Sequence, residues 1–179
     1  MIVNWNWRTR EMVVHFLKVF IPLNIYSLKQ SSDLLNETLN LLTKLLLDDQ
    51  LEVRELACFT LASLISWDIL PEKRRDDLIE QFREQANVTN GLVTRHGAFL
   101  GLCAFVYAYP DDLPPFLPGI LMFLTERLSE GQPISKSVST ALSVFKRLHE
   151  NKWFEYESKF TDEQLTQVQN SFFSASYFV

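Results

Sequence analysis

The chain has 179 residues, of which 47% are hydrophobic and 22% charged, a composition typical of a folded domain and not of a disordered segment. Its net charge of −5 argues against direct nucleic-acid binding, which needs clustered lysine and arginine. It has only 5 glycines and 7 prolines, too few for an all-β protein with frequent turns.

Helical periodicity dominates the chain from end to end. We expect a first helix over 5–28, interrupted near Pro22, and a second over 32–47 with Ser32 as its N-cap. The further predicted helices span 50–66, 72–86, 92–109, 113–129 and 133–149, followed by a short amphipathic piece around Trp153. The last helix opens at Thr161, where residues 161–164 (TDEQ) have the form of a capping box.

A repeat of similar helices is visible along the chain. Small or apolar residues recur at Val13, Ala57, Ala98 and Ala141, with spacings of 44, 41 and 43 residues, and Arg10, Arg54 and Arg95 each lie three residues before one of them. A period of about 40–47 residues carrying two helices is typical of HEAT repeats. We therefore predict an all-α fold, a HEAT/armadillo-like solenoid segment of antiparallel helix pairs, in which Asp49, Val53 and Arg54 link one repeat to the next.

The two ends of this stack differ. The first helix carries Trp5, Trp7, Met12, Val13, Phe16 and Phe20, and no earlier repeat in the chain covers them, so we expect either a dimer or a segment of a longer solenoid. No secretory signal precedes the first helix and no apolar run is long enough to span a bilayer. We expect a cytosolic or nuclear protein without membrane association.

The sequence holds no recognisable catalytic or metal-binding set. His15, His96 and His149 lie far apart, and no serine or cysteine nucleophile is arranged to use them. Cys58 and Cys103 sit in apolar helices and lack further ligands at a useful spacing. The pairs Asp48–Asp49 and Asp111–Asp112 are interpreted as carboxylates at helix starts and not as a divalent-ion site. We expect no enzyme activity, no cofactor and no metal.

Four blocks in order resemble the C-terminal region of the large HEAT-repeat proteasome activator family. They are residues 49–55 (DQLEVRE), 95–102 (RHGAFLGL), 132–134 (QPI) and 160–165 (FTDEQL). The resemblance covers nearly the whole chain. It implies a long α-solenoid that binds one end of the proteasome core without ATP. It also implies a nuclear and cytoplasmic location and a link to acetylated histones as substrates and to DNA repair, although no residue here matches a histone-binding site.

The resemblance also assigns a role to the last residues. Residues 1–173 would form the helical repeats and residues 174–179 a docking tail. Tyr177 takes the hydrophobic position of the family's tail, Phe178 stands where the family has tyrosine, and Val179 supplies the terminal carboxylate. Such a tail enters a pocket between two α subunits of the proteasome core, where a lysine can pair with the carboxylate, and promotes gate opening.

Phe178 departs from the family pattern. Phenylalanine keeps the ring but lacks the hydroxyl group, whose hydrogen bond is worth about 0.5–1.5 kcal/mol. We therefore expect docking to survive in weaker form and gate opening to be affected more than docking. Two alternatives remain open at this point. The tail can instead fold back on its own domain, and the chain can be a general HEAT scaffold or transport adaptor that binds partners through its concave face.

Overall fold

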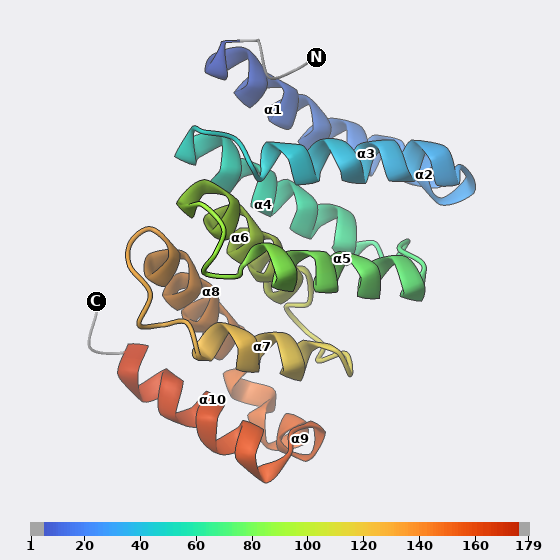
Figure 1. Cartoon of the computed structure of the whole chain (residues 1–179). Coiled ribbons are helices and arrows are strands. Elements are labelled where there is room, and N and C mark those ends of the chain that lie inside the picture. Colours follow the sequence, from blue (N-terminus) through green and yellow to red (C-terminus); the bar gives the residue numbers. More distant parts are fainter. Residues whose placement is uncertain (1–5, 176–179) are drawn as a thin grey trace. The chain divides into compact units, whose positions relative to one another are not determined.

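The computed structural model describes residues 6–175, and the side chains of residues 6–170. Within this range every regular element is helical (Figure 1), so the predicted all-α solenoid segment is confirmed. The chain divides into two compact units, residues 1–104 and 105–179, and α6 contains the boundary. Each unit is described by itself.

The first unit is built from α1 (Trp7–Leu23), α2 (Ile25–Gln30), α3 (Ser32–Leu45), α4 (Leu51–Ser66), α5 (Glu72–Gln85) and the first part of α6 (Leu92–Ala108). Pro22 lies inside α1, and the predicted break falls two residues later, at Asn24. The N-cap of α3 is Ser31 and not the predicted Ser32, because the Ser31 hydroxyl accepts from the Leu34 N–H at 3.2 Å.

α4 occupies the middle of the first unit and packs against both α1 and α3. It is apolar on most of its surface, as a helix enclosed by neighbours must be, and Val53, Ala57, Leu61 and Leu64 are fully buried. The three repeat alanines, Ala57, Ala98 and Ala141, are each 0% exposed. The small side chain at this position of α4, α6 and α8 therefore serves close helix packing, as the spacing predicted.

Two glycines bring α6 close to its neighbours. A Cβ at Gly97 would lie 2.1 Å from the backbone oxygen of Leu46, and one at Gly101 would lie 2.5 Å from the Phe82 ring. Both contacts are far shorter than ordinary van der Waals separation. The block around residues 95–102 is thus a close-packing surface, and glycine is required there for space and not for backbone freedom.

The second unit contains the end of α6, α7 (Leu117–Thr125), α8 (Ile134–His149), α9 (Trp153–Tyr156) and α10 (Asp162–Ala175). α10 packs against both α7 and α8. The predicted helix over 113–129 is wrong in length, because Pro114 and Pro115 hold the chain in an irregular segment until α7 begins. As a consequence, Asp111 and Asp112 do not lie at a helix start.

Candidate functional site

The three predicted docking residues, Tyr177, Phe178 and Val179, lie outside the described residues. The structure therefore bears on the helix that precedes them in the chain and on the groove and contacts around that helix. α10 is the element that would carry the tail.

α10 begins with the predicted capping box. The Gln164 N–H donates to Thr161 Oγ1 at 3.3 Å, and the Thr161 N–H donates to Gln164 Oε1 at 3.0 Å. Asp162 and Glu163 occupy the first turn, where a carboxylate is favoured by the positive end of the helix dipole. The start of α10 is therefore fixed by local chemistry that the sequence alone encodes.

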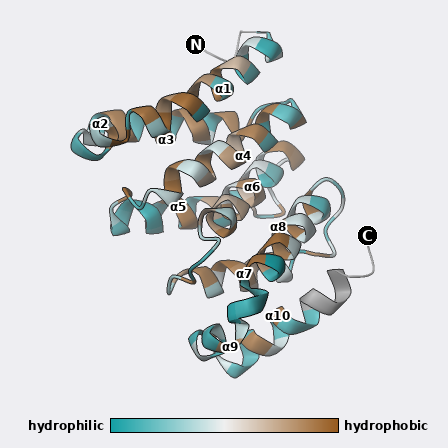
Figure 2. Cartoon of the chain, turned by 180° about the vertical axis from the view of Figure 1, so that it is seen from behind, coloured by the Kyte–Doolittle hydropathy of each residue, from teal (hydrophilic) through white to brown (hydrophobic). Residues whose placement is uncertain are grey.

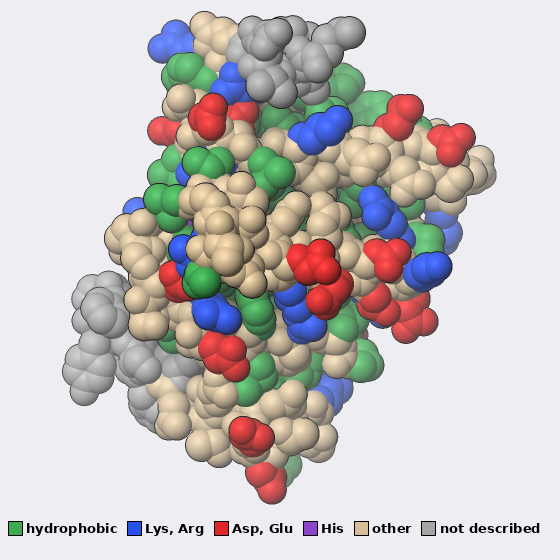
Figure 3. All heavy atoms as spheres, in the orientation of Figure 1, with side chains coloured by type: hydrophobic (Ala, Val, Ile, Leu, Met, Phe, Trp, Pro, Cys, Tyr) green, Lys and Arg blue, Asp and Glu red, His purple; other side chains and the backbone are tan. Residues whose placement is uncertain are grey.

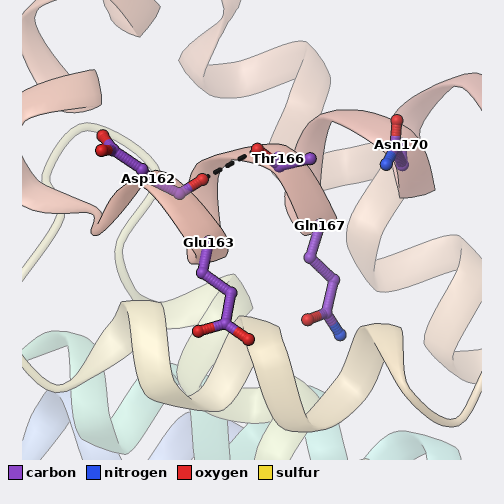
Figure 4. Close-up of a pocket in the computed structure, with 5 residues that line it drawn as sticks. All are labelled: Asp162, Glu163, Thr166, Gln167 and Asn170. Atoms are coloured by element: carbon purple, nitrogen blue, oxygen red, sulfur yellow. Dashed lines mark hydrogen bonds between the residues drawn. The ribbon is translucent and has the colours of Figure 1, made fainter.

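Contacts along α10 hold it on the second unit. Val168 is fully buried, and the Gln167 side-chain amide donates to Thr125 Oγ1 of α7 at 3.0 Å. Glu163 and Gln167 point toward the neighbouring helix in Figure 4. Both an apolar and a polar contact thus fix the orientation of α10 before the tail begins.

An open groove of about 480 Å³ runs along this part of α10. It is lined by Asp162, Glu163, Thr166, Gln167 and Asn170, all from α10 (Figure 4). The Thr166 hydroxyl is already used, since it donates to the backbone oxygen of Asp162 at 2.8 Å. The groove thus offers carboxylates, amides and one hydroxyl group, which are groups suited to polar surface contacts.

The segment between α8 and α10 is tied to the loop that precedes α7. The Tyr156 hydroxyl donates to the backbone oxygen of Asp111 at 2.7 Å, and Lys159 Nζ donates to the backbone oxygen of Leu113 at 2.9 Å. His149 is 1% exposed, with Nε2 3.2 Å from the backbone oxygen of Asp112. The Asp112 carboxylate also accepts from the Leu113 N–H at 2.7 Å and lies 3.5 Å from Lys159 Nζ. Asp111 and Asp112 therefore bind the α8–α10 segment from an irregular loop, which corrects their interpretation as helix-start carboxylates.

A second polar cluster lies in the first unit and links successive repeats. Arg10 of α1 binds the Asp48 carboxylate through both Nε and a terminal nitrogen. Arg54 of α4 donates to the backbone oxygens of Asp48 and Asp49 at 2.6 and 3.0 Å, and its Nε donates to His96 Nδ1 of α6 at 3.1 Å. The linking carboxylate is thus Asp48 and not the predicted Asp49, while Arg54 has the predicted role.

The pKa values in this cluster follow from burial and pairing. Burial alone would raise the pKa of Asp48, but the hydrogen bonds from Arg10 and the Gln50 N–H outweigh it, so the pKa lies below its usual value. Burial, followed by the charge of Arg54, lowers the pKa of His96 to about 4. His96 is therefore a neutral, fully buried acceptor at neutral pH, as expected of a packed histidine and not of a general base.

Burial also raises the pKa of both cysteine thiols. Cys58 and Cys103 are both buried and free, and burial raises the pKa of Cys103 to about 12. The Cys58 thiol donates to the backbone oxygen of Leu100 at 3.1 Å. Over the described part of the chain, no cluster of three or more histidine, cysteine or acidic side chains is placed to hold a metal ion. Among the same residues, no helix is long and apolar enough to cross a membrane.

Figure 3 shows both acidic and basic side chains on this face of the molecule, and neither sign covers it alone.

Sequence analysis missed one residue, which lies on α9. Phe154 is 88% exposed, and the only available signal was its place in a short amphipathic piece between two inward-facing aromatic residues, Trp153 and Tyr156.

Comparison with known proteins identifies the relatives of this chain. Residues 92–179 match the family described as "Proteasome activator complex subunit 4-like, C-terminal". The chain is 32% identical to proteasome activator complex subunit 4 of Bos taurus and 31% identical to that of Homo sapiens. It is 31% identical to subunit 4B of Danio rerio. Each alignment covers 97% of this chain and 10% of the relative.

The chain thus spans about a tenth of the length of these relatives. The family match begins at Leu92, the first residue of α6, and extends through the last three residues. Residues 92–179 are thus similar to the C-terminal region of the proteasome activator complex subunit 4 family, and nearly the whole chain is similar to members named proteasome activator complex subunit 4.

Proposed function

We propose that this chain binds the proteasome core through Tyr177, Phe178 and Val179 and has a regulatory role there, promoting entry of peptides without itself being catalytic. The observation that carries the proposal is the family match over residues 92–179, which includes these three residues. The relatives are named proteasome activators, and that activity is transferred here as a proposal.

The chemistry of the tail supports this role. A chain-terminal carboxylate on Val179 can form a charge-assisted hydrogen bond with a lysine in a pocket. The rings of Tyr177 and Phe178 add apolar area, and burial of one such side chain is worth roughly 1.5–3 kcal/mol. The capping box and the Gln167–Thr125 contact fix α10 ahead of the tail, which limits the conformational entropy lost on docking.

The test uses purified proteasome core and a short fluorogenic peptide. The chain is added intact, without residues 177–179, or with one glycine added after Val179, which moves the carboxylate but keeps every side chain. We expect stimulation by the intact chain and background hydrolysis with the other two. Co-sedimentation with the core separates docking from gate opening. A chain that co-sediments with the core but does not stimulate peptide hydrolysis can dock but cannot open the gate.

The departure at Phe178 gives a second comparison. Phe178→Tyr restores the hydroxyl group of the family pattern, and one hydrogen bond of about 0.5–1.5 kcal/mol corresponds to roughly two- to tenfold tighter binding. If instead the intact chain and the chain lacking residues 177–179 bind the core equally, the tail has no role. Binding would then map to the helical surface, as the scaffold alternative requires.

A further inference from the structure

The first unit carries a row of exposed apolar side chains. This apolar row consists of Met12, Phe16, Val19 and Leu23 of α1 and Tyr26 of α2, which are 59–81% exposed. Hydrophobic residues are visible along α1 in Figure 2. Single exposed apolar residues are ordinary on a protein surface, whereas a contiguous row of them marks a place of contact.

α1 has a second apolar side, which is already covered. Val14, Leu17 and Ile21 are 0–4% exposed, and α1 packs against α3 and α4. At about 100° per residue, the row residues of α1 lie on the opposite side of the helix from these three. A helix that is hydrophobic all round is normally buried all round. α4 follows this rule within the first unit, whereas α1 is covered on one side only.

The row is held in a fixed position. Arg10 of α1 pairs with the Asp48 carboxylate, so an ion pair as well as a buried apolar side anchors the helix. The Phe16 ring stacks on the Phe20 ring, with centroids 5.5 Å apart. Because the helix and the Phe16 ring are already ordered, contact with a partner costs little further conformational entropy.

The spacing of the row along α1 is the same in both directions. From Met12 through Phe16 and Val19 to Leu23, the steps are four, three and four residues, which is the alternation of a and d positions in a coiled coil. If two such helices lie antiparallel, residue 12 of one faces residue 23 of the other, and residue 16 faces residue 19. The e and g positions beside this seam, where like charges would repel, hold no lysine, arginine or acidic residue; they are Val13, His15, Phe20 and Pro22.

We propose that the apolar row binds a second copy of this chain, with the two α1 helices antiparallel. A symmetric dimer requires a surface that is complementary to itself. The symmetric spacing supplies this property, which a different partner would not need. At their exposed fractions, the five side chains offer on the order of 600 Å² per copy, close to the roughly 800 Å² that one side of a standard interface buries. The inference is independent of the docking tail and of the partner proposed for it.

Disulfide trapping tests both the pairing and its direction. One preparation of the chain carries Met12→Cys, and a second, distinguished by a mass tag, carries Leu23→Cys. The native cysteines stay in place, since both are buried. The two preparations are mixed under reducing conditions and then oxidised gently, and the crosslinked dimers are identified by mass. In the antiparallel pair residue 12 faces residue 23, whereas two copies of residue 12 lie about 16 Å apart along the helix axis.

Two control mixtures accompany this experiment. Val88→Cys mixed with Leu23→Cys measures crosslinking by random collision, because Val88 is 68% exposed but lies outside the row. Phe16→Glu added to the Met12→Cys chain tests whether the row itself brings the copies together, because it would bury an unpaired carboxylate in the seam. Circular dichroism checks that each variant keeps its helical signal.

We expect the mixture of Met12→Cys and Leu23→Cys to give at least fivefold more crosslinked dimer than either preparation gives with itself. The same excess is expected over the Val88→Cys control, and Phe16→Glu should reduce the yield to the level of that control. Crosslinks that join identical positions would overturn the antiparallel pairing. Equal yields in all mixtures would overturn the inference as a whole and leave the row to a different partner, such as a helix pair of another solenoid.

Discussion

At Gly97, one added methyl group would collide with neighbouring backbone. Its absent Cβ would meet the backbone oxygen of Leu46 at 2.1 Å, and a backbone atom cannot turn aside as a side chain can. We expect Gly97→Ala to lower the free energy of unfolding by about 3 kcal/mol or more, the upper end for overpacking. Gly91→Ala is the control, since nothing lies within 4 Å of its Cβ, and urea denaturation should show almost no change. Similar midpoints for both variants would contradict this packing.

His96 makes stability depend on pH in a defined window. Its pKa is lowered to about 4, first by burial and then by the charge of Arg54, whereas the unfolded chain has a histidine pKa of about 6.5. Between these values the unfolded state binds more protons, so stability falls as the pH falls from 6.5 toward 4. We expect a loss on the order of 2 kcal/mol over this window.

The measurement is the urea midpoint at pH 7 and at pH 4.5. His96→Asn keeps a buried acceptor for Arg54 without the titration, and its midpoint should change less between the two pH values. The titration of Asp48 does not interfere with this comparison. Its pKa lies below the ordinary value, so its contribution to the free energy of unfolding is lost only at a pH below this window. An equal change for both proteins would mean that His96 is not the group responsible.

The capping box decides how firmly α10 begins. Thr161→Ala removes the acceptor of the Gln164 N–H, and loss of such a cap costs about 1 kcal/mol. Because the cap acts on one helix end, we expect faster amide hydrogen exchange in the first turns of α10 and little change in α4. Thr140→Ala, an exposed threonine within α8, is the control and should leave exchange in α10 unaltered. Unchanged exchange in Thr161→Ala would show that packing alone fixes this helix end.

Most helices could be predicted from the sequence, because their apolar spacing and capping residues are local. The capping box at Thr161 is one example, and Leu92 as the first residue of α6 is another. Local pattern could not choose between neighbours such as Ser31 and Ser32, or Asp48 and Asp49, since the choice depends on which side chain meets its partner in space. The hydrogen bonds of Lys152 and Lys159 go to a loop more than 40 residues earlier in the chain, so a local pattern could not reveal them either.

The short length of the chain relative to its relatives affects how tightly it is expected to bind. The chain spans about a tenth of them, and a three-residue tail gains affinity mainly from whatever else holds it near its pocket. Weak binding by the intact chain is therefore compatible with the proposal, whereas binding that is unchanged by deletion of residues 177–179 is not.

The apolar row of the first unit also bears on how the chain behaves in solution. Met12, Phe16, Val19 and Leu23 of α1 and Tyr26 of α2 are 59–81% exposed, and hydrophobic residues are visible along α1 in Figure 2. The four residues of α1 are spaced three or four apart, which places them on one face of that helix. Contiguous exposed apolar surface of this kind promotes association.

We expect the isolated chain to self-associate with rising concentration, as measured by sedimentation velocity. Phe16→Glu combined with Leu23→Glu puts two charges into the row and should shift the chain toward monomer, because burying an unpaired carboxylate opposes contact between copies. Val88→Glu is the control, since Val88 is 68% exposed but lies outside the row. If the row drives association, only the double variant changes the sedimentation profile. Equal profiles for all three proteins would show that association, where it occurs, proceeds through another surface.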